Sequence, residues 1–172
     1  MSERALPRSV RRRTLSAALC LGALPLGGCS GARWVEQKKV GQVSWPRRIP
    51  IMVFKSAHIR DIDEDGLSDV VATTLSAELE RRGIQADVME LTGEPRLPRI
   101  ELAFWSIDFG TAGAMAESSA LEQGSISVDC AFVSAEDEVV FIGRLVGRGK
   151  DGNLSAGAEA AGKAIYEALT EG

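Results

Sequence analysis

An acidic segment of the chain, residues 61–69, carries side chains that could bind a calcium ion. It reads Asp-Ile-Asp-Glu-Asp-Gly-Leu-Ser-Asp, which places oxygen ligands at the first, third, fifth and ninth positions of a calcium loop and glycine at the sixth. The twelfth position of such a loop supplies a bidentate carboxylate, and here it is Ala72. Carboxylates also stabilise the N-terminus of a following helix, which would explain the same residues without a metal. The sequence leaves open whether calcium binds to Asp61, Asp63, Asp65 and Asp69.

The other polar residues do not suggest a catalytic group, a metal site or a cofactor site. His58 is the only histidine of the chain, so we interpret it as structural or exposed rather than as part of a Ser/His/Asp triad or a metal centre. Glu101, Asp108 and Asp129 could share one sheet face as a carboxylate pair, but a solvated acidic face is the simpler interpretation. The sequence therefore predicts a protein that is not an enzyme, with no catalytic residue and no cofactor.

The first 28 residues have the order of a bacterial export signal. An arginine-rich region precedes an apolar stretch, Thr14–Leu26, and small residues follow it. A helix over this stretch would span about 20 Å, which is short of the ~30 Å hydrocarbon core of a membrane. We interpret residues 1–28 as a cleaved signal peptide. Arg12-Arg13 also resembles a twin-arginine signal, so the choice between general and twin-arginine export stays open.

Leu26-Gly27-Gly28-Cys29, at the end of this segment, resembles the lipobox of bacterial lipoproteins. In that family the cysteine sulfur receives a diacylglyceryl group, and cleavage makes the cysteine the new N-terminus. The resemblance implies that Cys29 is lipidated and that the lipid anchors the protein in a membrane. Ser30 matches the pattern for the outer membrane, facing the periplasm, rather than the inner membrane. An ordinary cleaved signal with a chance cysteine is the alternative.

The cysteine content agrees with this interpretation. Of the three cysteines, Cys20 lies in the signal and Cys29 in the lipobox, which leaves Cys130. A single remaining cysteine cannot form an internal disulfide. Because Cys130 lies in an alternating apolar segment, we expect a small buried hydrophobic residue rather than a redox or metal-binding group.

Charge divides the rest of the chain into two parts. Residues 29–48 contain five basic residues and one acid, whereas residues 49–172 contain ten basic and 22 acidic residues, a net charge of −12. We expect residues 29–48 to form a basic tether along an anionic membrane, with Trp34 and Trp45 at the headgroup level. The alternative is that its valines and tryptophans pack on the domain as an extra edge strand. The acidic charge of residues 49–172 argues against nucleic-acid binding.

Hydrophobic periodicity over residues 49–172 predicts one α+β domain. The pattern favours a two-layer sandwich with a mixed sheet of about five strands, uncertain at its edges, and two helices on one face. Gly162 inside the last helix suggests close packing of that helix on the sheet. The expected strands cover residues 49–54, 84–91, 99–109, 125–134 and 139–146, and the expected helices cover residues 67–82 and 155–169.

Three local features stand out in the domain: Gly66-Leu67-Ser68-Asp69 before the first helix, Arg82-Gly83 after it, and the Gly/Ala-rich loop 110–124. With these features the domain resembles small, uncharacterised bacterial lipoproteins of α+β fold. More distantly, it resembles lipoprotein components of envelope assembly and transport systems. The resemblance implies an accessory role, such as binding an envelope protein or self-association. A periplasmic carrier of a small molecule or lipid is the alternative. Trp105 or Phe109 exposed on a sheet face would favour protein binding, and a cavity lined by them would favour a carrier.

Overall fold

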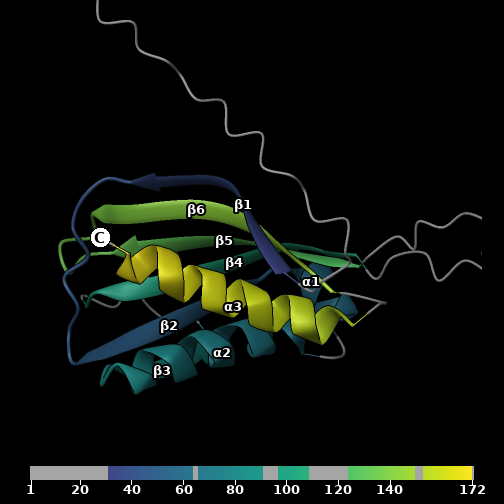
Figure 1. The fold of residues 1–172 in the computed structure, drawn as a ribbon, viewed down its shortest axis with the longest axis horizontal. Coiled ribbons are helices and arrows are strands. Elements are labelled where there is room, and N and C mark those ends of the chain that lie inside the picture. The colour runs from purple at the N-terminus through teal and green to yellow at the C-terminus, as the bar shows by residue number, and fades with distance from the viewer. Residues whose placement is uncertain (1–30, 64–65, 91–96, 109–123, 150–152, 172) are drawn as a thin grey trace, which may run out of the picture.

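A six-stranded mixed sheet and three helices make up the described part of the protein (Figure 1). The structure is a computed structural model that describes residues 31–63, 66–90, 97–108, 124–149 and 153–171. The elements follow the chain in the order β1 (Gly31–Lys39), β2 (Arg48–Lys55), α1 (Ala57–Ile62), α2 (Leu67–Arg81), β3 (Gln85–Glu90), β4 (Arg99–Asp108), β5 (Ser125–Val133), β6 (Val139–Arg148) and α3 (Leu154–Thr170).

The strand order across the sheet is β1-β6-β5-β4-β2-β3. β2 lies parallel to both of its neighbours, β3 and β4, whereas the other pairs are antiparallel. The predicted β-α-β unit is β2-α2-β3, and the predicted hairpin is β5-β6. The predicted α+β architecture with a mixed sheet is therefore confirmed, with one strand and one short helix more than expected.

Helices α2 and α3 lie side by side on one face of the sheet (Figure 1). In α2, Leu67, Val71, Leu75 and Leu79 recur every four residues and are buried against the sheet, as one face of a helix requires. The helix ends at Gly83, whose φ of +81° favours a residue without a side chain. The strands contribute fully buried residues to the same core, among them Ile49, Ile51, Ile100, Leu102, Ile126, Val128 and Leu145.

Residues 31–39, which fall inside the predicted tether, form the edge strand β1. β1 pairs with β6 in an antiparallel register that begins at Gly31 opposite Arg148. Trp34 packs its ring edge-to-face on Phe141, with 5.6 Å between the ring centroids. For residues 31–39 the structure therefore agrees with the edge-strand alternative and not with a tether along a membrane, because Trp34 buries apolar surface on the domain. Among the described residues, none of the helices is long and apolar enough to cross a membrane.

The short helix α1 lies between the expected strand 49–54 and the expected helix 67–82, where no regular element was expected. The Ser56 side chain caps it by accepting a hydrogen bond from the Ile59 N–H at 3.2 Å, and Ile59 is fully buried. A helix with a single buried residue is too short to show a hydrophobic period in the sequence.

The expectation that Gly162 marks close helix–sheet packing is wrong, because this glycine faces the other helix. A Cβ added at Gly162 would lie 2.7 Å from the Val71 carbonyl oxygen and 2.8 Å from the Thr74 Cβ, both on α2. The close helix–sheet approach occurs instead at Gly157, where an added Cβ would lie 2.7 Å from the Arg148 carbonyl carbon and 2.8 Å from the Gly149 nitrogen. Both approaches allow backbones to come nearer than side chains would permit.

Gly162→Ala is therefore expected to destabilise the domain, although alanine favours helix formation. The added methyl group meets backbone on α2, and overpacking of this kind lowers the free energy of unfolding by about 1–3 kcal/mol. Urea denaturation measures the change. Lys163→Ala, at the exposed neighbouring position of the same helix, should change the value by less than about 0.5 kcal/mol. Equal stability of Gly162→Ala and wild type would contradict the close approach.

Candidate functional site

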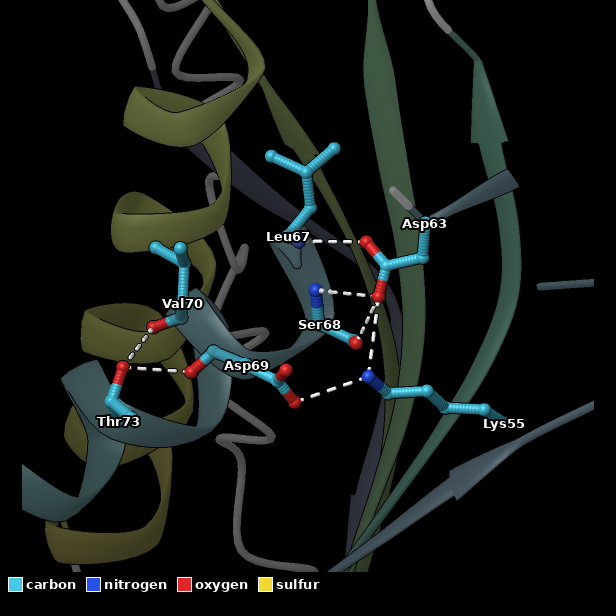
Figure 2. A network of polar contacts seen from close by, with 7 residues as sticks. All are labelled: Lys55, Asp63, Leu67, Ser68, Asp69, Val70 and Thr73. Atoms are coloured by element: carbon cyan, nitrogen blue, oxygen red, sulfur yellow. Dashed lines mark hydrogen bonds and ion pairs between the residues drawn. The ribbon is translucent and has the colours of Figure 1, made fainter. Parts of the chain in front are cut away.

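A buried carboxylate, Asp63, organises the junction between α1 and α2 (Figure 2). Its side chain is 1% exposed. One oxygen accepts a hydrogen bond from the Leu67 N–H at 2.6 Å, and the other accepts bonds from the Ser68 N–H at 3.4 Å and from the Ser68 hydroxyl. Asp63 thereby accepts hydrogen bonds from N–H groups in the first turn of α2. Such N–H groups have no partners inside the helix. The residue at the N-cap position itself, Gly66, has no side chain to do this.

Lys55, at the end of β2, places its ammonium group against the same carboxylate. Its Nζ lies 3.3 Å from Asp63 Oδ2 and 3.1 Å from Asp69 Oδ1 (Figure 2). Partial burial lowers the pKa of Lys55, but hydrogen bonds and charge from Asp69 and Asp63 outweigh it and hold that pKa above its ordinary value. Because the folded pKa is raised, the stabilisation is fully present below the unfolded lysine pKa of about 10.4 and is lost only as the pH rises through the folded value.

This arrangement gives the acidic segment a structural role. Asp63 and Asp69, two of the four candidate calcium ligands, share the ammonium group of Lys55. Asp61 is exposed on α1, and Asp65 lies outside the described residues. Within the described ranges, no three histidine, cysteine or acidic side chains converge where a metal ion could be held. The helix-capping alternative therefore accounts for the two acids that the structure brings together.

The sheet face opposite α2 and α3, here called the far face, carries a second group of polar contacts. The Arg144 guanidinium carbon lies 5.5 Å from the ring centroid of Trp105, and Arg144 also donates to both carboxylate oxygens of Asp129, at 2.6 and 2.9 Å. The Trp105 ring is nevertheless 61% exposed, and Ile142, on the same face, is 48% exposed. We call Trp105, Asp129, Ile142 and Arg144 the Trp105 patch. Its combination of an aromatic ring, an arginine and an aliphatic side chain is typical of binding surfaces.

A break in the register of β4 separates Trp105 from Ile107. The pairing with β5 shifts between Phe104 and Ser106, so that Phe104 and Ile107 both face the core, and they are 4% and 7% exposed. Strict alternation would place Ile107 on the face of Trp105. The extra residue of a bulge reverses the alternation beyond it, which places Ile107 on the helix side, whereas Trp105 stays on the far face.

A carboxylate pair, the less favoured interpretation of the acids on this face, does not form between Glu101 and Asp129. These two acids lie on neighbouring strands, but each is bound to its own arginine: Arg99 Nε lies 2.6 Å from Glu101 Oε1, and Arg144 holds Asp129. Asp108 is exposed at the end of β4, and His58 is exposed on α1. Glu101 and Asp129 therefore act as partners of arginines on a partly solvated face.

Cys130 lies in the core, as the strand pattern predicts, and is 1% exposed. Burial, and secondarily the negative charge of Asp129, raises the pKa of the Cys130 thiol far above its ordinary value. The reactive form of a cysteine is the thiolate. At neutral pH Cys130 is therefore a protonated, unreactive hydrophobic group.

The concave sites of the described surface are open depressions rather than enclosed cavities. One of about 490 Å³ lies between the loop after β1 and the ends of α2 and α3, where Trp45, Arg82 and Leu169 line it. Another of about 290 Å³ lies on the far face, where three residues of the Trp105 patch, Asp129, Ile142 and Arg144, line it together with Lys38. Trp105 lines neither of them. The exposed tryptophan thus lies on a surface and not in a pocket.

Asp63→Asn is expected to lower the free energy of unfolding by about 2–4 kcal/mol. The amide removes the negative charge opposite Lys55, and its nitrogen cannot accept a hydrogen bond as the second carboxylate oxygen does. The loss should be the same between about pH 6 and 9, since Lys55 keeps its proton throughout that range. Urea denaturation at several pH values measures it. Asp61→Asn, an exposed acid of the same segment, should stay within about 0.5 kcal/mol of wild type. A similar loss for both variants would mean that burial of Asp63 is not the cause.

Comparisons with solved structures show a likeness of fold. A PelC variant from Paraburkholderia phytofirmans, described as a dodecamer, matches with a TM-score of 0.50 and 16% identity over 80% of this chain and 95% of that chain. A second PelC dodecamer from that organism gives 0.48 and 14% over 80% and 96%. A homologue of neuraminyllactose-binding hemagglutinin from Helicobacter pylori gives 0.45 and 11% over 77% and 88%. No protein-family model matches the chain, and no curated protein sequence does.

Proposed function

We propose that the protein is a lipid-anchored lipoprotein of the bacterial envelope whose domain binds protein and assembles with further copies of itself. The observation that carries the proposal is the position of the lipobox relative to the fold. Cys29 precedes the first residue of β1, Gly31, by two positions. Cleavage before Cys29 would remove a complete export signal and leave every described element intact. Ser30 favours the outer membrane, with the domain in the periplasm.

The surface of the domain supports binding rather than catalysis. Trp105 is exposed on a sheet face, which is the arrangement that we expected of a protein-binding component. The acids that could have formed a catalytic pair are each held by an arginine. A small-molecule carrier would need a cavity that buries most of its ligand, whereas the depression of about 490 Å³ is open and mixes Lys39 and Arg82 with Trp45 and Leu169.

Self-association is supported by the fold likeness to PelC, which is described as a dodecamer. Closed rings form when one surface of a subunit meets a different surface of the next. This domain offers two different edges for such a contact. β1 exposes Val35, and β3 exposes Val88 and Met89, which are 39% and 42% exposed. Edge strands with exposed apolar side chains are a common means of association.

The anchor is tested by Cys29→Ser in a Gram-negative host fed with labelled palmitate. Wild type should take up the label and sediment with membranes, and the variant should lose both, because serine lacks the sulfur that carries the lipid. Cys20→Ser is the matched control, since it changes a cysteine of the signal that lies outside the lipobox. Label and membrane association retained by Cys29→Ser would refute the anchor.

Assembly is tested on the lipidated protein in mild detergent. Light scattering coupled to size-exclusion chromatography should give a mass several times that of one chain, and the mass should persist on dilution to micromolar concentration. The double variant Val88→Lys/Met89→Lys, measured in the same way, should give a mass closer to that of one chain, because charged side chains on an edge strand oppose pairing with another edge. A monomeric mass for wild type would refute self-association and leave the anchor untouched.

A further inference from the structure

The distance between the proposed anchor and the fold restricts how the domain can sit on its membrane. Only Ser30 separates Cys29 from Gly31, and a step of two positions along the chain reaches no more than about 7 Å. Gly31 is already paired within the sheet, opposite Arg148. A lipid on Cys29 would therefore hold one end of the sheet at the headgroups. This end, here called the anchor end, is marked by Gly31, Arg148, Ser125 and Asp108, which stand opposite one another across β1, β6, β5 and β4.

The far face near the anchor end carries the side chains that favour a membrane surface. One row of paired residues crosses the four strands and consists of Arg33, Val146, Ser127 and Ser106. Trp105 is the neighbour of Ser106 on β4. This row is two residues from the end row, or about 7 Å along the strands. Trp34 and Leu145 point toward the helices, so the alternating residues Arg33 and Arg148 point to the far face. Both arginines are exposed.

Charge distinguishes this part of the molecule from the rest of its surface. At the opposite end of the β5-β6 hairpin, the turn exposes three successive acids, Glu136, Asp137 and Glu138. On the helix side of the anchor end, Asp69 and Asp63 are paired with Lys55, and Asp61 is exposed on α1. On the far face, Asp108 stands in the end row, and Glu36 stands opposite Arg144. The two exposed arginines of this face, Arg33 and Arg148, therefore lie at the end of the sheet that is remote from the acidic turn.

We propose that the far face at the anchor end, with Trp105, Arg33 and Arg148, rests on the anionic lipid headgroups of the membrane that holds Cys29. This inference rests on the proposed lipid anchor. Tryptophan and arginine are the side chains that lie best at a membrane interface, since the ring enters the headgroup region and the guanidinium binds lipid phosphate. The sheet would then be tilted, with α2 and α3 away from the bilayer and the acidic hairpin turn at its distant end.

The test uses the lipidated full-length product in vesicles of phosphatidylethanolamine and phosphatidylglycerol that contain brominated acyl chains, which quench nearby tryptophans. Wild-type fluorescence should be quenched, and Trp105→Phe should lose most of that quenching. Trp45→Phe is the matched control, because Trp45 packs on Phe132, which lies toward the hairpin turn, and it should keep the wild-type response. Replacing Arg33 and Arg148 by glutamine should reduce the quenching.

The same samples separate the possible failures. Mass spectrometry of the Cys29 peptide and sedimentation with the vesicles report on the anchor, so an unlipidated protein that stays in solution refutes the proposed function and this inference together. A lipidated, vesicle-bound protein in which Trp105→Phe is quenched like wild type overturns the inference alone. If Trp105 is protected from both the brominated lipid and aqueous iodide, a second copy covers it, which also overturns the membrane contact.

Discussion

The position of α3 depends on glycine at its two closest approaches to the rest of the fold. Gly157 lies against the backbone where β6 ends, and Gly162 lies against the Val71 carbonyl of α2. α3 thus contacts the antiparallel part of the sheet and also the helix of the β-α-β unit. In the sheet these two parts of the chain are joined through the β2-β4 pairing. On the helix side, α3 holds the same two parts together. A side chain at either glycine would separate layers that the buried aliphatic residues hold together.

The placement of both long helices on one side leaves the far face to a different kind of chemistry. Its side chains include ion pairs, Arg144 with Asp129 between β6 and β5 and Arg99 with Glu101 along β4, instead of an apolar layer. The face is uneven, because Met52 is 2% exposed whereas Trp105 is 61% exposed. A surface of this kind suits contact with another surface, whether protein or lipid, because several of its charged groups already have partners and its aromatic side chain is available.

The sequence allowed the main elements to be predicted because their burial is periodic. α2 shows the spacing of a helix with one buried face, and β5 alternates along its whole length. β1 was only one of two alternatives for its segment, because it is an edge strand with a bulge at Val35, so that Trp34 is half-buried while most of its other side chains are exposed. Alternation cannot be recognised where nearly all positions meet solvent.

The polar contacts were harder to predict than the elements. The capping role of the acids near α2 was foreseen from their position, but Lys55 was not, since it joins them only after β2 and α2 pack together. The bulge in β4 had the same effect on Ile107, whose direction depends on pairing with β5. Such contacts follow from the relative placement of distant segments, and a single sequence does not specify that placement locally.

The pairing of β1 with β6 also fixes the order in which the domain can be completed. β1 is the first described strand of the chain, and Arg148, opposite its first residue, is separated from it by almost the whole of the described fold. A chain that crosses a membrane from its N-terminus delivers β1 long before β6, so β1 stays without its partner until the last strand has emerged. Pairings between such distant segments form late and slowly. Completion of the sheet therefore waits for the last strand of the chain, and until then β1 remains an unpaired edge.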